Sequence, residues 1–202
     1  MKKRTDVDAI VFDLGNVLLT FNPLAHLKKR FPGPLAERMN EAIFASRHWV
    51  EMDRGVLTME EIAARIVKDA PDMAEWLQPA LDTYGDMVQP IPENVGLLPG
   101  LKAAGYRLYV LSNIGEAFFA EMRARNPFLA QFDGLMISGA VHILKPDPAI
   151  FLLLLHEFRL DPARTLFVDD RQENIDGASA AGIRGICYAR HEQLRELFAP
   201  DA

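Results

Sequence analysis

Five short apolar runs, each followed by polar or turn-forming residues, constrain the fold of this chain more than any other feature. They are Asp8 to Phe12, Arg107 to Leu111, Gly134 to Ile137, Thr165 to Val168 and Gly185 to Tyr188. Such runs are typical of strands buried on both faces, and helix-like stretches lie between them, at 94–104, 115–125, 148–158 and 174–181. Strands that alternate with helices form βαβ units. The pattern therefore predicts an α/β fold with a doubly wound parallel sheet, covered by helices on both faces.

The segment from about residue 21 to 90 has a different character, because it lacks β-branched, strand-like runs. Helical patterns extend over Leu35 to Phe44 and Thr58 to Lys68, and the second opens with a capping-box sequence. Pro90-Ile91-Pro92 predicts a hinge where the chain returns to the α/β pattern. We therefore expect a core domain of residues 1–20 and 91–202, with an all-α cap domain of residues 21–90 inserted after the first strand.

Several helix boundaries are marked by capping or turn-forming residues. Asp147 is placed to cap a helix with Pro148 at its first position, and Gly105 and Gly182 follow apolar segments as helix stops. Pro99-Gly100, within the stretch 94–104, predicts a broken or late-starting helix there.

The composition excludes several classes of protein. Half of the 202 residues are hydrophobic and a quarter are charged, as in globular rather than disordered chains. The net charge of −6, with scattered Lys and Arg residues, argues against nucleic-acid binding. The longest run of large apolar residues, Ile150 to Leu155, has six residues, whereas a membrane span needs about 20. We therefore expect neither a nucleic-acid partner nor a membrane partner.

The start of the chain and its cysteine content predict a cytoplasmic protein. Met1-Lys2-Lys3-Arg4 resembles the charged beginning of a secretory signal, but Asp6, Asp8 and Asp13 interrupt the apolar segment that a signal needs. The single cysteine, Cys187, cannot form an intrachain disulfide, which agrees with a reducing compartment. The five His residues show no zinc-ligand spacing.

Polar residues follow three of the predicted strands at the point where each ends, and a lysine lies in a nearby loop. These residues are Asp13, Ser112, Asn113, Asp169 and Asp170, with Lys145 in the loop before the 148–158 helix. In a doubly wound sheet, ligands bind beyond the carboxyl ends of the strands. We therefore expect these side chains to converge on one site.

The residue types in this set indicate phosphate chemistry. Crowded carboxylates raise one another's pKa unless a cation lies among them. Oxygen-rich sites suit Mg²⁺, which takes one or two carboxylates together with substrate phosphate, and a carboxylate can itself be the nucleophile. Lys145 and Mg²⁺ would neutralise the transferring phosphoryl oxygens, to which Ser112 and Asn113 could donate hydrogen bonds. An acidic chain would thereby gain the local positive charge that an anionic substrate requires.

Four ordered motifs resemble those of the haloacid dehalogenase-like (HAD) hydrolase superfamily. They are Phe12-Asp13-Leu14-Gly15-Asn16-Val17, Leu111-Ser112-Asn113, Lys145-Pro146 and Phe167-Val168-Asp169-Asp170. The resemblance spans nearly the whole chain. It is strongest to phosphatases with a small helical cap after the first motif, particularly the bacterial α-glucose-1-phosphate phosphatase group. It implies a Rossmann-like core and an Mg²⁺-dependent phosphatase acting on a small phosphorylated metabolite, such as a sugar phosphate, through an aspartyl-phosphate.

The resemblance also implies roles for the acidic positions. Asp13 resembles the nucleophile that forms the phospho-enzyme and binds Mg²⁺ through its other oxygen. Gly15 occupies the position whose backbone carbonyl is a metal ligand. Asp170 matches the principal acidic ligand, and Asp169 matches a second ligand or one that acts through water.

The remaining matched positions concern the phosphoryl group and the surroundings of the metal. Ser112, Asn113 and Lys145 match phosphoryl-binding positions, with Lys145 also steadying the Asp13 carboxylate. Asn174 matches a supporting polar position near the metal, and Asp176 is a weaker candidate.

One departure from the family pattern concerns proton transfer. Most of the family's phosphatases have a second Asp two residues after the nucleophile, as general acid and then general base. Here that residue is Gly15, which has no side chain to transfer a proton. General acid–base catalysis contributes about 10²–10⁴-fold. The departure is consistent with slow turnover, with a good leaving group, or with a replacement donor from the cap.

Two other functions stay open for this sequence. Metal-independent 2-haloacid dehalogenases also lack the second Asp, but they resemble this chain less at Asp169 and Asp170, where they carry uncharged residues. Two extra carboxylates would repel a haloacid's own carboxylate unless a cation intervened. The third function is a non-catalytic phosphate-binding module.

Part of the cap segment is a candidate for substrate selection. Arg47, His48 and Trp49 could contact substrate, although helix packing is the commoner role for a Trp. Phe21 and Asn22 could border the entrance. The sequence leaves open the physiological substrate, the proton donor and the oligomeric state.

Overall fold

The computed structural model describes residues 4–198 and shows a five-stranded, fully parallel sheet in the order β3-β2-β1-β4-β5. The strands are β1 (Ala9–Phe12), β2 (Arg107–Ser112), β3 (Gly134–Ile137), β4 (Thr165–Asp169) and β5 (Arg184–Cys187). All five predicted strands are confirmed, each boundary within one residue. The charged start Met1 to Lys3, considered above as a signal sequence, lies outside the described residues.

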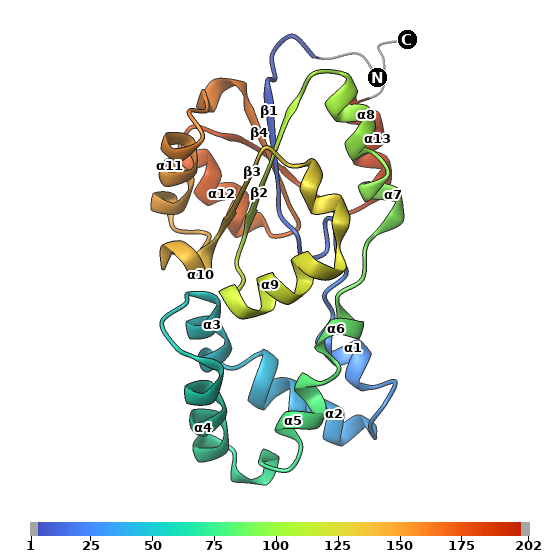
Figure 1. The fold of residues 1–202 in the computed structure, drawn as a ribbon, viewed down its shortest axis with the longest axis vertical. Helices are drawn as coiled ribbons and strands as arrows, with labels where there is room; N and C mark the ends of the chain where they lie inside the picture. Colours follow the sequence, from blue (N-terminus) through green and yellow to red (C-terminus); the bar gives the residue numbers. More distant parts are fainter. Residues whose placement is uncertain (1–3, 199–202) are drawn as a thin grey trace.

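Alternate residues of the central strand β1 face two different helical layers. Ala9 and Val11 pack with α11 (Pro148–Glu157) and α12 (Gln172–Ala180). Ile10 and Phe12 pack in the cluster that contains α8 (Leu98–Ala103) and α13 (His191–Phe198). Figure 1 shows these two layers on opposite sides of the sheet. Because both faces are covered, every position of β1 is apolar, and the predicted doubly wound α/β fold is confirmed.

The helices of the core largely follow the predicted stretches. α9 (Glu116–Arg125), α11 and α12 correspond to three of them, and shorter elements complete the core: α7 (Pro92–Val95), η3 (Pro127–Gln131), α10 (Ser138–Val141) and η4 (Pro162–Arg164). The predicted stretch 94–104 is interrupted between α7 and α8, before Pro99 rather than at it. Pro99 lies in the first turn of α8, where the fixed φ of proline and its missing N–H are tolerated.

All elements between β1 and Pro90 are helical, and they form the lower part of the molecule in Figure 1. They are α1 (Pro23–Leu27), α2 (Gly33–Met39), η1 (Asn40–Phe44), α3 (Arg47–Asp53), α4 (Met59–Asp69), η2 (Pro71–Met73), α5 (Leu77–Leu81) and α6 (Tyr84–Met87). We call residues 23–87 the helical segment. The capping box of α4 is confirmed, because Thr58 and Glu61 exchange hydrogen bonds of 2.8 and 3.2 Å. The helix predicted to Phe44 is α-helical only to Met39 and then becomes a π-helix.

The two connections to the helical segment run side by side. The backbone N–H of Thr20 donates to the carbonyl of Gln89 at 2.8 Å, and that of Ile91 donates to Leu18 at 2.9 Å. The segment therefore leaves and rejoins the core at one place, next to the proline pair predicted as a hinge. The domain division at residues 21 and 90 itself stays a prediction.

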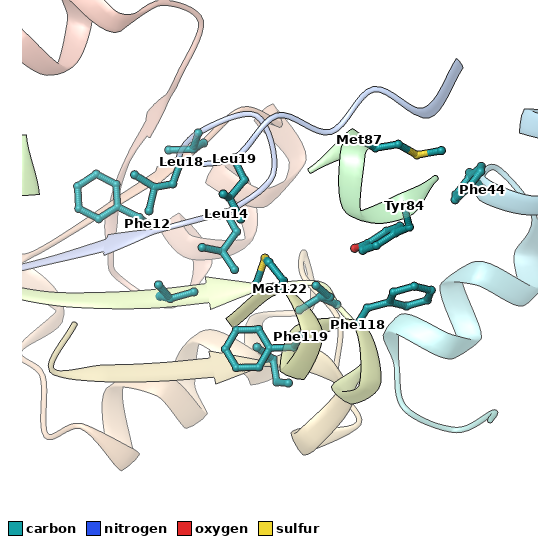
Figure 2. Packing of buried hydrophobic residues seen from close by; sticks show 14 of the residues in the cluster. Phe12, Leu14, Leu18, Leu19, Phe44, Tyr84, Met87, Phe118, Phe119 and Met122 are labelled. Carbon is teal, nitrogen blue, oxygen red and sulfur yellow. The ribbon is translucent and has the colours of Figure 1, made fainter. Parts of the chain in front are cut away.

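A continuous apolar cluster joins the helical segment to the core. Figure 2 shows it running from Phe12 on β1 through Met122 and Phe118 on α9 to Tyr84 and Phe44. The rings of Tyr84 and Phe118 are 4.1 Å apart between centroids.

None of the helices within residues 4–198 combines the length and apolar character that a bilayer crossing requires.

The turn after α3 packs against the core at Gly55. This residue has a φ of +75°, and an added Cβ would lie 2.1 Å from the carbonyl oxygen of Gly139. We predict that Gly55→Ala lowers the free energy of unfolding by about 2 kcal/mol, measured by urea denaturation.

Gly33→Ala is the matched control. An added Cβ there meets nothing within 4 Å, so its effect should stay within about 0.5 kcal/mol. If both variants were equally stable, the contact between Gly55 and Gly139 would not exist in solution.

Candidate active site

The register of the sheet brings the predicted site residues to one edge. Phe12 lies opposite Val110 on β2 and opposite Val168 on β4, so Asp13 and Asp169, each the next residue, are neighbours. The backbone N–H of Asp13 donates to the carbonyl of Val168 at 2.8 Å. Acidic and polar side chains from three adjacent strands thus meet at their carboxyl ends, as the sequence predicts.

Lys145 lies buried between two of these carboxylates. Its Nζ is 2.9 Å from Oδ1 of Asp13 and 2.7 Å from Oδ2 of Asp169, and it also donates to the carbonyl of Leu111 at 2.9 Å. Lys145 thus makes two hydrogen bonds, to Asp169 and to Leu111, and an ion pair with Asp13, whose buried Oδ1 accepts no hydrogen bond among residues 4–198. A buried charge without partners would cost several kcal/mol, so this arrangement holds Lys145 and both carboxylates in fixed positions.

Asp169 is completely buried and already has a full set of hydrogen bonds. Asn174 Nδ2 lies 2.8 and 3.0 Å from its two oxygens, and the backbone N–H of Arg171 donates to Oδ1 at 2.9 Å. With Lys145, four donor contacts reach one carboxylate. Asn174 thus lies beside the acidic cluster, as predicted, whereas Asp176 is exposed and accepts a hydrogen bond from Gln172 at 2.8 Å.

Asp170 is held by Asn16, a residue of the first motif to which the sequence analysis assigned no role. Asn16 Nδ2 donates to Oδ2 of Asp170 at 3.0 Å, and the backbone N–H of Phe21 donates to Asn16 Oδ1 at 3.0 Å. Asn16 has a φ of +54°, a conformation that Asn tolerates better than most residues. An Asn directly after Gly15 in the loop was the signal that could have identified it.

The electrostatic surroundings of Asp13 favour a neighbouring cation. Burial raises the pKa of the Asp13 carboxyl, and the charge of Asp169 raises it further, whereas the Lys145 ammonium lowers it. Ligand oxygens of Asp13, Asp169 and Asp170 all lie within 4.8 Å of one another. Three carboxylates against one ammonium leave a local excess of negative charge, and an all-oxygen donor set suits a hard divalent cation.

The other predicted residues surround this cluster in different ways. Ser112 and Gly15 line the same cavity as Asp13. The side-chain amide of Asn113 both accepts from the backbone N–H of Lys145 and donates to its carbonyl, each at 2.9 Å. The Asn113 side chain therefore fixes the loop that carries Lys145.

The cavity has a volume of about 420 Å³, with a polar floor on the core and a mostly apolar wall. Phe21, Trp49, Val50 and Val88 form much of that wall. Trp49, a candidate for substrate contact, lines the cavity, and its ring also packs against Phe118, the commoner role, at 5.3 Å between centroids.

The remaining specificity candidates are engaged elsewhere. Arg47 and His48 both pair with Asp69 at 2.9 Å, at the opposite end of α3 from Asp53. Asn22 caps α1 by accepting from the backbone N–H of Ala25 at 3.0 Å. None of these three residues is among the described residues that line the cavity.

The wall also contains a carboxyl group that sequence reasoning missed. Asp53, the last residue of α3, lines the cavity. Burial raises the pKa of Asp53 to about 8, although a backbone hydrogen bond from Gly115 opposes the shift. No sequence pattern marked this residue, because it stands in a helix far from the four motifs.

This fold and this acidic site define a family. The family model described as haloacid dehalogenase-like hydrolase matches residues 7–182. The chain therefore belongs to the haloacid dehalogenase-like hydrolases, and it is an enzyme of that family.

Similar proteins include phosphatases and dehalogenases. Sesquiterpene phosphatase astK of Aspergillus oryzae is 27% identical over 96% of this chain and 97% of its own length. (S)-2-haloacid dehalogenase 1 of a Pseudomonas species is 31% identical over 59% of this chain and 53% of its own. The HAD family enzyme bt-2542 of Bacteroides thetaiotaomicron, solved with magnesium and inorganic phosphate, has a TM-score of 0.75 at 21% identity, covering 95% and 99% of the two chains. This structural likeness supports the fold.

The buried position of Lys145 generates a prediction about stability. Lys145→Met leaves Asp13 and Asp169 adjacent and buried without a cation. We expect it to lower the free energy of unfolding by about 3 kcal/mol in buffer without divalent cations, measured by urea denaturation.

Lys102→Met is the control, because Lys102 pairs with Asp133 at 2.6 Å but keeps about a third of its side chain exposed. An exposed pair of this kind contributes up to about 1 kcal/mol. Equal losses in the two variants would contradict the buried position of Lys145 between the two carboxylates.

Proposed function

We propose that the protein is an Mg²⁺-dependent phosphatase that hydrolyses a small phosphate monoester through an aspartyl-phosphate on Asp13. The observation that carries the proposal is a cluster of three carboxylates at a cavity, two of which are paired with one buried ammonium group. A site with this excess of negative charge needs a cation before it can bind an anionic ester.

Asp13, Asp170 and the backbone carbonyl of Gly15 would hold the metal ion. When bound, Mg²⁺ would neutralise phosphoryl oxygens and lower the repulsion between carboxylates. The part proposed for Asp169 is to fix Lys145 and to act on the ion through water, because hydrogen bonds already occupy both of its oxygens.

The chain's own residues would then perform the displacement. Lys145 orients one oxygen of the Asp13 carboxylate and leaves its negative charge available for attack on phosphorus. Ser112 and backbone N–H groups of the loop after β2 would donate to the phosphoryl oxygens, where charge spreads in the transition state. Asn113 would act by positioning the Lys145 loop, because both ends of its side-chain amide bind that backbone.

The alternative of metal-independent haloacid dehalogenation fits this site less well. A haloacid brings its own carboxylate into the cavity, and Asp13, Asp169 and Asp170 would repel it there. One relative is a haloacid dehalogenase, so a direct assay is needed. Chloride release from 2-chloropropionate without Mg²⁺ would support this alternative.

The cavity wall favours an alcohol with apolar surface. Phe21, Val50 and Val88 offer the wall no hydrogen-bonding side chain, and its polar groups are the Trp49 indole N–H, the Tyr84 hydroxyl and the Asp53 carboxyl. These are fewer than the hydroxyl groups of a sugar, which would be left partly unpaired there. The sesquiterpene phosphatase named above acts on a substrate of that apolar kind. We therefore propose that phosphate esters of apolar alcohols are preferred over the sugar phosphates expected from the sequence.

The first prediction concerns the nucleophile and the metal. Asp13→Asn removes the nucleophilic charge, so we expect kcat for phosphate release from a panel of monoesters to fall at least about 10³-fold. Addition of a chelator to the unmodified enzyme should remove activity, and excess Mg²⁺ should restore it. Asp72→Asn, an exposed carboxylate paired with Arg38, is the control with unchanged activity. Activity that survives Asp13→Asn or the chelator would contradict the mechanism.

The second prediction concerns substrate choice. We expect kcat/KM to be higher for n-hexyl phosphate than for a hexose phosphate. Val50→Thr keeps the volume of the wall and adds a hydroxyl, so it should reduce that ratio by about 3- to 10-fold. Val56→Thr is the control, because Val56 is as exposed as Val50, 48% against 46%, but is not among the lining residues. A preference for the sugar ester would contradict the apolar assignment.

A further inference from the structure

The proposed reaction needs a proton donor that the loop after β1 does not contain. Gly15 has no side chain, although space is not the reason: an added Cβ would lie 3.9 Å from Oδ2 of Asp13 and 4.0 Å from Cβ of Phe21. In an in-line displacement the leaving oxygen lies on the side of phosphorus opposite the nucleophile. A donor for that oxygen should therefore stand on the cavity wall that faces Asp13.

Asp53 is a carboxyl group on that wall. It lines the same cavity as Asp13 and Ser112, and it comes from the helical segment rather than from the sheet. Figure 1 shows α3 lying below α10, the helix that follows β3.

The other titratable groups of the described lining have different roles. Asp13, Lys145 and Asp170 belong to the polar floor. Arg171 and Glu173 are exposed and form an ion pair with each other. Tyr84 is buried, and burial raises the pKa of its hydroxyl, which makes it a weaker acid than an ordinary phenol. Asp53 is therefore the group of the wall best suited to exchange protons near neutral pH.

Hydrogen bonds fix the backbone of Asp53 against the core. Ser138 Oγ donates to the carbonyl of Asp53 at 2.5 Å and accepts from the backbone N–H of Ile114 at 2.9 Å. One hydroxyl thus links the end of α3, the start of α10 and the loop after β2. Next to it, His142 Nδ1 lies 3.1 Å from the carbonyl of Arg54. The backbone of Asp53 is therefore fixed against α10 and the loop after β2.

The position of Asp53 is unfavourable for stability. A carboxylate at the C-terminus of a helix faces the negative end of the helix dipole. Among the ion pairs within residues 4–198, none involves Asp53. Residues that break local stability rules in this way concentrate at functional sites.

We propose that Asp53 is the general acid and base of the reaction, a role that rests on the proposed phosphatase function. As the bond between Asp13 and phosphorus forms and the ester P–O bond breaks, the Asp53 carboxyl gives its proton to the ester oxygen, and a neutral alcohol leaves. The Asp53 carboxylate then takes a proton from the water that attacks phosphorus. The bond between phosphorus and Asp13 breaks, inorganic phosphate leaves, and Asp53 is protonated again.

The leaving group provides the decisive test. p-Nitrophenolate leaves as an anion without a proton, whereas the alkoxide of n-hexyl phosphate requires one. Under single-turnover conditions with Mg²⁺, Asp53→Asn should slow phosphorylation of Asp13 by n-hexyl phosphate about 10²–10⁴-fold and by p-nitrophenyl phosphate less than about threefold. The same variant should release a burst of one p-nitrophenolate per enzyme and then accumulate the phospho-enzyme, because the second step lacks its base.

Asp82→Asn is the matched control, an exposed carboxylate of the helical segment that accepts from Gln78 at 2.7 Å. It should leave both rates unchanged. If Asp53→Asn slowed both esters equally, or neither, Asp53 would have no role in proton transfer. Failure of the proposed function itself would look different, because the unmodified enzyme would then release neither p-nitrophenolate nor phosphate.

A pH profile of the unmodified enzyme is a second test that does not depend on how the variant folds. Because the pKa of Asp53 is raised to about 8, the donor is protonated below that pH. Protonation of Asp13 at lower pH slows both esters alike, so the ratio of the two rates reports on Asp53. The single-turnover rate with n-hexyl phosphate, divided by that with p-nitrophenyl phosphate, should stay level below pH 8 and fall as the pH rises above it. Parallel profiles for both esters would contradict the assignment.

Titration of groups on the neighbouring elements would not produce this difference between the two esters. Besides Asp13 and Lys145 of the floor, the titratable residues near α3 include Tyr84 on α6, Asp69 on α4 and His142 after α10. Hydrogen bonds from His48 and Arg47 lower the pKa of Asp69, so it is ionised throughout the range, and the Tyr84 hydroxyl stays protonated. A loss that affects only the alkyl ester would separate Asp53 from all of them.

Discussion

The burial of one ammonium group between two carboxylates is the interaction on which the rest of the site depends. Lys145 can occupy its position only because Asp13 and Asp169 approach it from adjacent strands. The carboxylates in turn can be buried only because Lys145 lies between them. The parallel register of β1 and β4 provides this geometry, and the Asn113 side chain and Asn174 complete it from two further directions. Catalytic and structural requirements therefore act on the same few atoms.

The sheet and the polar floor could be predicted from sequence because both depend on short-range patterns. Continuous apolar runs follow from burial on two faces, and the residues that end those runs are necessarily placed at one edge. The strand positions were accurate to one residue for this reason. The late start of α8 at Leu98 was predicted from Pro99-Gly100, a local signal. The π-helical continuation after Met39 was not predicted, because packing against neighbours decides such irregularities.

The wall of the cavity could not be predicted in the same way. Asp53, Val50 and Val88 reach the cavity through the placement of helices whose sequence shows only ordinary amphipathic patterns. Arg47 and His48, next in sequence to Trp49, turn toward Asp69 instead, since the seven residues of α3 present different faces to the cavity and to α4. The residues of the cavity wall thus depend on tertiary contacts, whereas those of the polar floor depend on strand ends.

The pairing of the two connecting segments, Leu18–Thr20 and Gln89–Ile91, bears on how such enzymes can evolve. Hydrogen bonds hold the two connections to the helical segment together, so the segment is in effect a loop whose two ends lie side by side on the core. Each doubling of a loop's length costs only about 0.6 kcal/mol in closure entropy. The cavity wall that the helical segment contributes can therefore be lengthened, shortened or replaced at little thermodynamic cost, while Lys145 and its carboxylates stay unchanged beneath it.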